Sequence, residues 1–314
     1  MRGFWYNGAR LAFALAVIGA LTPLHVSGQR ARQGLLTLGD ARLFYEVLGD
    51  GDPIIVVHGG PGLDHSYLRP GLDALATRNT VIYYDQRATG RSTAELVDGT
   101  INLDAFVTDI DALRQVLGYQ EVSVLGHSFG ALIALEYAVR YPDNARSVIL
   151  MNPVEPGRRF EEVTAQRQRD RALPEDAEEM AELRASEGFF ARDPATLSQV
   201  YRVAFRQVLK DRELIDQIDL ELAVATARNG QDVAALIGAS LGVVDWWDRL
   251  GEIEVPTLVL HGRYDVPPVE MSQALAEAIS AGTFEVLDSG HFPYIEDRNG
   301  LLSAISGFFA GLGR

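Results

Sequence analysis

The sequence predicts an α/β protein with a mostly parallel, doubly wound sheet and an inserted helical segment. Six short runs are continuously apolar rather than alternating, which is typical of strands buried on both faces. Helical periods fill most of the gaps between these runs. Residues 154–249 break this alternation with a long polar stretch that has no convincing strand. A chain of 314 residues suits one large domain or a domain with an insertion.

The predicted strands follow one another from the first third of the chain. Residues 34–52 predict a β-hairpin with Gly39-Asp40 at its turn. The six apolar runs are residues 53–57, 80–85, 121–126, 147–151, 257–262 and 283–288. Their lengths and bounding turn residues favour buried strands over helices.

Three amphipathic or apolar stretches predict helices of the sheet's two faces. Residues 103–118 have a shared apolar face at helical spacing, and Gly118 is a plausible terminator. That face consists of Phe106, Ile110, Leu113 and Leu117. Residues 128–141 are mostly apolar, which indicates a central helix, and residues 299–312 close the chain as another helix.

The polar stretch predicts several helices inserted between two sheet strands. We expect residues 154–249 to form a lid, called the cap below, over the carboxyl edge of the sheet. The core would then consist of residues 29–153 and 250–314. The alternative is a second helical layer that has no role at a site.

Composition excludes several classes of partner and cofactor. The net charge is −15, and a nucleic-acid partner usually requires a basic patch. The absence of cysteine excludes disulfides, thiol nucleophiles and cysteine metal sites. The six histidines show no HExxH or similar clustered spacing. We therefore expect no metal and no cofactor.

The N-terminus has the parts of a secretory signal peptide. Arg2 and Arg10 precede a short apolar run, and small residues end the stretch near Val26-Ser27-Gly28. We expect residues 1–28 to be removed, which predicts a secreted or periplasmic protein with no stable membrane span after removal. The alternatives are an uncleaved anchor or a start codon placed too early.

The segment "VLGHSFG" (124–130) predicts the nucleophile of the protein. It lies between a buried strand and an apolar helix, and Gly126-x-Ser128-x-Gly130 matches the nucleophile elbow. In such a turn the serine adopts a strained backbone, and side chains two residues away on either side would clash. Ser128 Oγ is therefore expected above the sheet, near the positive end of a helix.

A serine hydroxyl is a weak nucleophile and requires a base, which an acid orients in turn. The order serine, acid, histidine predicts Asp265 and His291, which follow the last two predicted strands. Asp288 competes as the acid but is close to His291 in sequence. Carboxyl ends of parallel strands share one edge, so Ser128, Asp265 and His291 are expected together.

The loop "HGGPG" (58–62) follows the first buried strand, where an acyl-transfer site needs a backbone donor for the oxyanion. We predict Gly60 N–H as this donor, with Gly59 in reserve, and Phe129 N–H as the second donor. Phosphate binding is not supported, because GK[ST] and GxGxxG patterns are both missing. The remaining histidines near these motifs are expected to be structural: His58, His127 and the half-buried His261.

These motifs resemble the α/β-hydrolase family, and within it the proline iminopeptidases of peptidase family S33. The resemblance covers nearly all of residues 35–153 and 250–314, and its specific part is "HGGPG", "DHSYL" and "YYDQRATGRS" (83–92). Ala88-Thr89 replaces the usual pair in the last segment. The family implies an α/β-hydrolase fold with a helical cap and a serine aminopeptidase that acts on short peptides. The elbow "GHSFG" differs from the GGSWG of many proline-specific members and is widespread among esterases and lactonases.

In the family, cap carboxylates bind the ammonium group of the substrate. The cap has many acidic residues, most of which should form a solvated face. They are Glu161, Glu162, Glu175, Asp176, Glu178, Glu179, Glu182 and Glu187. Trp246 and Trp247 either line an apolar pocket or anchor the cap to the core.

Three functions are compatible with these residues. The first is a metal-free aminopeptidase that releases N-terminal residues from short peptides through an acyl-enzyme. The second is a carboxylesterase or lactone hydrolase with the same triad. The third, from another class, is a ligand sensor on a hydrolase fold that turns over slowly.

Overall fold

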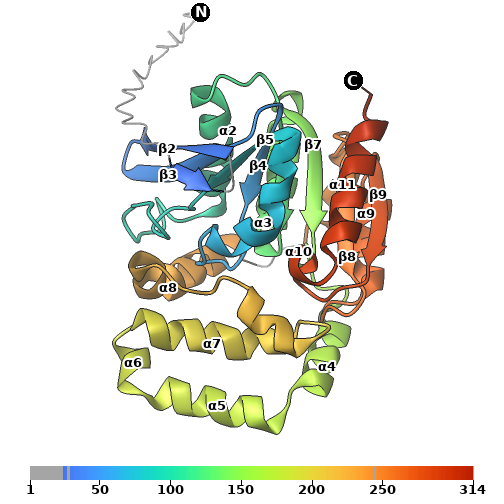
Figure 1. Cartoon of the computed structure of the whole chain (residues 1–314). Coiled ribbons are helices and arrows are strands. Elements are labelled where there is room, and N and C mark those ends of the chain that lie inside the picture. The colour runs from blue at the N-terminus through green and yellow to red at the C-terminus, as the bar shows by residue number, and fades with distance from the viewer. Residues whose placement is uncertain (1–23, 27–28, 243–244, 314) are drawn as a thin grey trace, which may run out of the picture.

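The computed structural model describes residues 24–26, 29–242 and 245–313 (Figure 1). Within them a nine-stranded sheet has the order β1-β2-β3-β5-β4-β6-β7-β8-β9. The strands are β1 (Leu24–Val26), β2 (Gln29–Leu38), β3 (Ala41–Leu48), β4 (Asp52–Val57), β5 (Asn79–Tyr84), β6 (Val122–His127), β7 (Ala145–Met151), β8 (Thr257–Gly262) and β9 (Gly282–Leu287). Neighbours from β5 to β9 are parallel, whereas β1, β2 and β3 pair antiparallel and β3 joins β5 antiparallel. The predicted mostly parallel α/β fold is confirmed.

The direction of winding reverses beside β4. The chain passes from β4 to β5 on one side and then returns to place β6 on the other side. Val57, the last residue of β4, pairs with Gly126 of β6. A reversal of this kind opens a crevice at the carboxyl ends of the strands, where α/β proteins bind ligands. The glycine loop, residues 58–62, follows β4, and Ser128 follows β6, so both lie at the carboxyl ends of the two strands beside the reversal.

Helices and apolar side chains cover both faces of the sheet. The face with Ile55 and Val57 packs against α2, α3 and α9, and the face with Ile54 and Val56 packs against α1 and α11. The bounds are η1 (Ser66–Leu68), α1 (Arg69–Leu72), η2 (Asp73–Thr77), α2 (Leu103–Val116), α3 (Phe129–Arg140), η3 (Pro142–Asn144), η5 (Trp247–Glu252), α9 (Val269–Ala278), α10 (Pro293–Glu296) and α11 (Arg298–Gly311). Two covered faces explain why β4 to β8 are continuously apolar. The expectation of burial on both faces is wrong for β9, which lies at the end of the sheet with most of its residues exposed or half-buried. The predicted terminator Gly118 has φ 80°, two residues beyond the end of α2.

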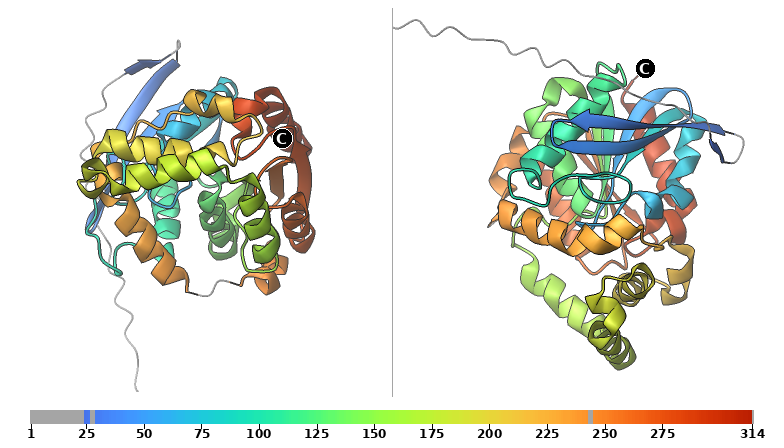
Figure 2. Two further views of the ribbon diagram at one scale, coloured as in Figure 1. Left: turned by 90° about the horizontal axis from the view of Figure 1, so that it is seen from below. Right: turned by 90° about the vertical axis from the view of Figure 1, so that its left-hand side faces the viewer.

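The stretch between β7 and β8 is helical in the residues that the structure describes. It contains α4 (Glu161–Arg171), α5 (Pro174–Ala185), α6 (Glu187–Phe190), α7 (Pro194–Arg206), η4 (Arg212–Gln217) and α8 (Val224–Leu241). Figures 1 and 2 show α5, α6 and α7 as a layer apart from the sheet, beyond the arrowheads of the parallel strands. The division into core and cap, with its stated boundaries, stays a prediction.

The N-terminal prediction falls mainly outside the described part of the chain. Residues 1–23 and 27–28 lie outside it, and the three residues between them form β1. Signal removal and export therefore stay predictions. Among the helices of the described ranges, none has both the length and the apolar character that a bilayer crossing requires.

Candidate active site

Ser128 lies at a sharp turn between β6 and α3. Its φ of 55° and ψ of −121° are unusual for a residue with a side chain, and its N–H donates to Met151 O at 3.0 Å. A Cβ on Gly126 would collide with the carbonyl of Gly130, and a Cβ on Gly130 would collide with the carbonyl of Val57. The two glycines of the motif are therefore required by close backbone packing. Ser128 remains partly exposed at this turn.

His291 and Asp265 meet after the last two strands. His291 Nδ1 lies 2.7 Å from Asp265 Oδ2, and the Asp265 side chain is buried. Asn152 Nδ2 donates to the same carboxylate oxygen at 2.8 Å, and Val266 N–H donates to Oδ1 at 2.7 Å. Burial alone would raise the pKa of Asp265, but the adjacent His291 and the hydrogen bonds lower this pKa to about 2. The carboxylate is thus an ionised acceptor for the imidazole.

Asp288, the competing acid, lies elsewhere. Its exposed carboxylate pairs with Lys210 Nζ at 2.6 Å, which lowers the pKa of Asp288. The sequence-based preference for Asp265 as the partner of His291 agrees with this arrangement.

The elbow and the His291 loop are joined through His127. His127 Nε2 lies 2.9 Å from His291 O, and the centroids of the two rings are 4.9 Å apart. Ser128 follows His127 directly, so the structure brings Ser128, His291 and Asp265 to one edge. The described residues show no hydrogen bond between Ser128 Oγ and His291. Catalytic hydrogen bonds are often long in unliganded sites, so this geometry is compatible with a triad.

The glycine loop approaches Ser128 closely. A Cβ on Gly59 would lie 2.9 Å from the Ser128 Cβ, and Gly60 has φ 122° before a cis bond to Pro61. Gly59 N–H donates to Tyr67 Oη at 2.7 Å, so the reserve donor is already occupied. Gly60 N–H has no acceptor among the described residues. Phe129 N–H belongs to the first residue of α3 and therefore has no partner within the helix.

The other histidines near these motifs are buried and hydrogen-bonded. His58 Nε2 accepts from Gln86 N–H at 3.0 Å, so Nδ1 donates to Gly59 O at 3.0 Å and holds the glycine loop. His261 contacts Ser272 Oγ and Pro267 O. The expectation of a half-buried His261 is wrong, since its side chain is fully enclosed between β8 and α9. Burial lowers the pKa of both histidines.

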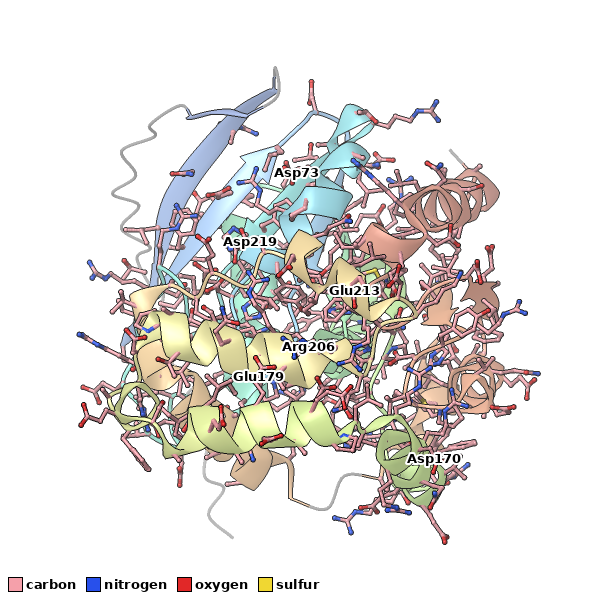
Figure 3. All side chains as sticks on the ribbon, turned by 60° about the horizontal axis from the view of Figure 1, so that its bottom comes forward. Asp73, Asp170, Glu179, Arg206, Glu213 and Asp219 are labelled. Carbon is pink, nitrogen blue, oxygen red and sulfur yellow. The ribbon has the colours of Figure 1, made fainter. Side chains whose placement is uncertain are left out.

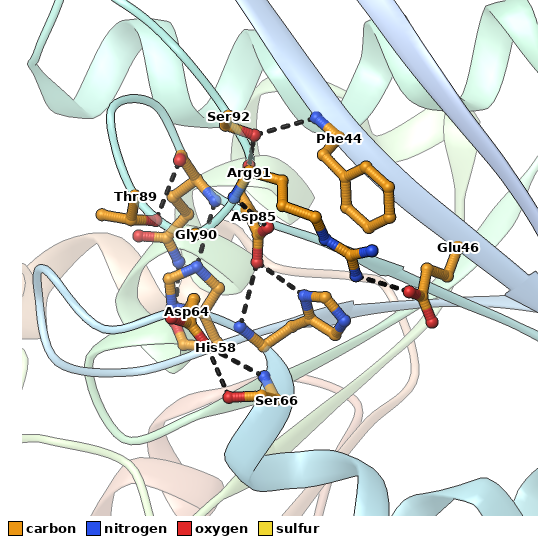
Figure 4. Close-up of polar contacts among 12 residues, drawn as sticks. Phe44, Glu46, His58, Asp64, Ser66, Asp85, Thr89, Gly90, Arg91 and Ser92 are labelled. Carbon is orange, nitrogen blue, oxygen red and sulfur yellow. Dashed lines mark hydrogen bonds and ion pairs between the residues drawn. The ribbon is translucent and has the colours of Figure 1, made fainter. Parts of the chain in front are cut away.

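The segment "DQRATGRS" forms a buried hydrogen-bonded turn (Figure 4). Asp85 Oδ1 lies 2.5 Å from His65 Nδ1, and Asp85 Oδ2 accepts from Arg91 N–H at 2.8 Å. Ser92 Oγ donates to Asp85 O and accepts from Phe44 N–H. These bonds hold the segment itself in place, and within it Gln86 supports the glycine loop. Gln86 Nε2 donates to His58 O, and Gln86 N–H donates to His58 Nε2.

The replaced pair of this segment includes a strained residue. Ala88 has φ 62°, in the left-handed region that glycine adopts without cost. Its carbonyl accepts from Asn229 Nδ2 of α8 at 2.9 Å, and Gly90 N–H donates to Thr226 Oγ1 of the same helix. The segment therefore also docks the last cap helix onto the core.

The cap carboxylates do not form a free acidic cluster. Six of the eight candidates are exposed: Glu161, Glu162, Glu175, Glu178, Glu182 and Glu187. The other two are paired within the cap, since Asp176 accepts from Arg206 and Arg212 and Glu179 accepts from Arg206. Figure 3 shows Glu179 and Arg206 between α5 and α7.

The two tryptophans follow the anchoring alternative. Trp247 is buried against Phe160, and its Nε1 donates to Glu155 Oε1 at 3.3 Å. Trp246 is half-buried and packs against the core beside Val139 and Leu250. Both join the return of the cap to the sheet layer.

Three further residues support the site and were not singled out from sequence. Asn152 bonds Asp265 and also donates to Gly290 O at 3.0 Å; its place directly after β7 could have indicated it. Arg167 of α4 donates to Asp265 O and Val266 O at 2.8 and 2.9 Å. Glu296 accepts from Gly290 N–H and Lys210 N–H. No local pattern distinguishes Arg167 or Glu296 from other surface charges.

Comparisons with known proteins agree with this architecture. The model of the family described as "alpha/beta hydrolase fold" matches residues 52–298. A proline iminopeptidase from Heyndrickxia coagulans is 31% identical over 266 residues, which are 83% of this chain and 91% of the relative.

Solved structures show the same fold. A proline iminopeptidase from Mycobacterium smegmatis has a TM-score of 0.68 at 24% identity, with 89% of this chain and 98% of the other covered. A thermophilic esterase from Thermogutta terrifontis has a TM-score of 0.66 at 24% identity, with coverages of 94% and 100%. The chain is therefore a hydrolase that belongs to the α/β-hydrolase family and resembles the proline iminopeptidases within it.

Proposed function

We propose that this hydrolase acts through a serine acyl-enzyme, with Ser128 as nucleophile, His291 as base and Asp265 as the orienting acid. The observation that carries the proposal is the 2.7 Å bond between His291 Nδ1 and Asp265 Oδ2. His127, which directly precedes the strained Ser128, bonds His291 O and so connects this pair to the elbow. Because Asp265 is ionised and accepts a hydrogen bond from His291 Nδ1, the other ring nitrogen, Nε2, has no hydrogen and serves as the base toward Ser128 in this proposal.

In the proposed acylation, Ser128 Oγ attacks the substrate carbonyl carbon while His291 Nε2 takes the hydroxyl proton. The tetrahedral intermediate collapses, and His291 returns the proton to the leaving amine or alcohol. Water then attacks the acyl-enzyme with His291 again as base, which releases the acid and restores Ser128.

Gly60 N–H and Phe129 N–H are the proposed donors to the oxyanion. Their support is that Gly59 N–H is engaged by Tyr67, while Gly60 N–H has no acceptor in the described part of the chain. Phe129 N–H lies at the start of α3, where the helix dipole favours negative charge. Two such donors stabilise charge that develops only in the transition state.

We infer that the preferred substrate is a short peptide, from which the protein releases the N-terminal residue. The relative from Heyndrickxia coagulans and the resemblance of "HGGPG" and "DQRATGRS" to the proline iminopeptidase motifs support an aminopeptidase. A second candidate is an ester, because the cap carboxylates that could bind an ammonium group are exposed or paired with arginine.

Parallel assays separate the two substrates. Turnover of proline β-naphthylamide, or of another aminoacyl β-naphthylamide, is expected beside p-nitrophenyl acetate hydrolysis. Cleavage of the ester with no arylamide turnover at any N-terminal residue would reject the aminopeptidase. Ser128→Ala should remove both activities, and turnover that persists at the wild-type rate would reject the serine mechanism.

We also propose that the protein is exported after removal of residues 1–28. Support comes from the basic start and short apolar run alone. N-terminal sequencing of the protein recovered from its native cell tests this, and a mature chain that starts at Met1 would contradict it.

A further inference from the structure

Tyr67 and His127 lie between the three loops that carry the proposed catalytic groups. Both side chains are almost fully buried, at 2% and 1% exposure. Tyr67 Oη lies 2.7 Å from Gly59 N and 2.8 Å from His127 Nδ1. His127 Nε2 lies 2.9 Å from His291 O. These contacts form one unbroken chain from the glycine loop to the loop of the base.

The direction of each hydrogen bond in this chain follows from its ends. His291 O can only accept, so His127 Nε2 carries a hydrogen. Burial, with His291 nearby, lowers the pKa of His127 to about 3, so the neutral ring has no second hydrogen. Nδ1 must therefore accept from the Tyr67 hydroxyl, whose oxygen accepts from Gly59 N–H. In this one arrangement, every polar group that joins Gly59, Tyr67, His127 and His291 has its hydrogen-bond partner.

These hydrogen bonds connect groups whose relative placement determines the rate of an acyl transfer. Gly59 precedes the proposed donor Gly60, His127 precedes Ser128, and the carbonyl that accepts from His127 belongs to His291. A misplacement of about 1 Å between reacting groups can lower a rate about 100-fold. Tyr67 and His127 make no hydrogen bond to the side chains of Ser128, His291 or Asp265 in the described residues. The His127 ring packs beside the His291 ring, with centroids 4.9 Å apart, so both residues are expected to act by placing the loops and the base.

We propose that Tyr67 and His127 are positioning residues that hold the glycine loop, the serine elbow and the His291 loop in one register. This inference rests on the proposed serine mechanism. It adds two residues to that mechanism and assigns a single tautomer, with hydrogen on Nε2, to His127.

Tyr67→Phe removes the central hydroxyl and leaves Gly59 N–H and His127 Nδ1 without partners. We expect kcat per active site, titrated with a fluorophosphonate, to fall about 10- to 100-fold while KM changes little. Tyr294→Phe is the matched control. Tyr294 is equally buried, and its ring lies 6.5 Å from that of Tyr67, but its hydroxyl has no hydrogen bond in the described residues. Wild-type kcat in Tyr67→Phe, or an equal loss in Tyr294→Phe, would overturn the proposal.

His127→Gln tests whether the two residues act as a unit. The amide nitrogen can still donate to His291 O. The amide oxygen is bonded to Cδ rather than to Cγ, so no acceptor then stands at the position of Nδ1, where Tyr67 donates. Tyr67→Phe should therefore lower kcat much less in the His127→Gln background than in the wild type. Fold-losses that simply multiply in the double variant would contradict a connected chain.

The tautomer gives a test on the unaltered protein. Nitrogen-15 NMR should show a bare Nδ1 and a protonated Nε2 for His127 at neutral pH, and the reverse assignment would overturn the proposal. Ser128→Ala separates this inference from the mechanism on which it rests. Activity in Ser128→Ala rejects the mechanism, whereas an inactive Ser128→Ala with a fully active Tyr67→Phe rejects the positioning role alone.

Discussion

The sheet edge and the cap hold their charged side chains in different ways. Asp265 and Asp85 at the sheet edge are buried, and each accepts from an imidazole and from backbone N–H groups. Helix α4 has no buried residue, and α5 buries only Asp176. A buried charge must have its partners in place, whereas an exposed one has water. The edge is therefore specified residue by residue, whereas the charged side chains of α4 and α5 are exposed or held in a few ion pairs.

The largest expected effect concerns the acid at the sheet edge. Asp265→Asn should lower kcat by roughly 10³- to 10⁴-fold, because the amide no longer stabilises the imidazolium or fixes its tautomer. Steady-state kinetics on p-nitrophenyl acetate measure this. Asp288→Asn, at the exposed pair with Lys210, should leave kcat unchanged. Equal losses in both variants would remove the distinction between buried and exposed acids.

A cap substitution should lower stability rather than chemistry. Asp176→Asn weakens the contacts with Arg206 and Arg212 and should cost about 2 kcal/mol of unfolding free energy, as for hydrogen bonds to charged groups. Chemical unfolding measures this cost, and faster hydrogen exchange in α5 and η4 would locate it. Glu175→Gln, exposed on the same helix, is the control. A loss of kcat with unchanged stability would contradict this view of the cap.

Acid should lower the stability of the folded protein through His127, the buried histidine of the elbow. The pKa of His127 is about 3 in the folded state and about 6.5 when unfolded, so the unfolded state binds the extra proton as the pH falls below 6.5. His127 should therefore cost about 2 kcal/mol of stability between pH 7 and pH 5. Urea unfolding at both pH values, with His127→Gln as comparison, isolates this contribution. The same pH dependence in both proteins would refute it.

The smallest effect is expected where the cap touches the acid loop. Arg167→Met removes the donors to Asp265 O and Val266 O, and kcat should fall about three- to tenfold through displacement of the acid. Arg169→Met is the control on the same helix, since the exposed Arg169 side chain donates to Gln166 and, within the described ranges, to no group of the Asp265 loop. An equal response of the two variants would show that the bonds from Arg167 to the Asp265 loop have no specific role.

Much of the sheet edge could be predicted because local patterns report it. Continuous apolar runs located the strands to within one or two residues. For β4 to β8 the reason is that burial on both faces leaves no polar side to alternate, whereas the edge strand β9 is apolar without such burial. Gly126 and Gly130 indicated the elbow because their contacts are with nearby backbone. Asp265 and His291 were found by their places at the ends of consecutive strands, which a parallel sheet brings together.

The sequence by itself therefore determined the α/β sheet, the elbow at Ser128 and the order of the residues proposed to act with it. Only the tertiary structure decided which polar groups meet across long separations. It paired Asn152 with Asp265, placed Arg167 on the acid loop, and joined Gly59, Tyr67, His127 and His291. It also showed that the cap carboxylates are exposed or paired. The physical reason is that local periodicity reports burial, whereas a hydrogen bond between distant residues depends on how the loops pack.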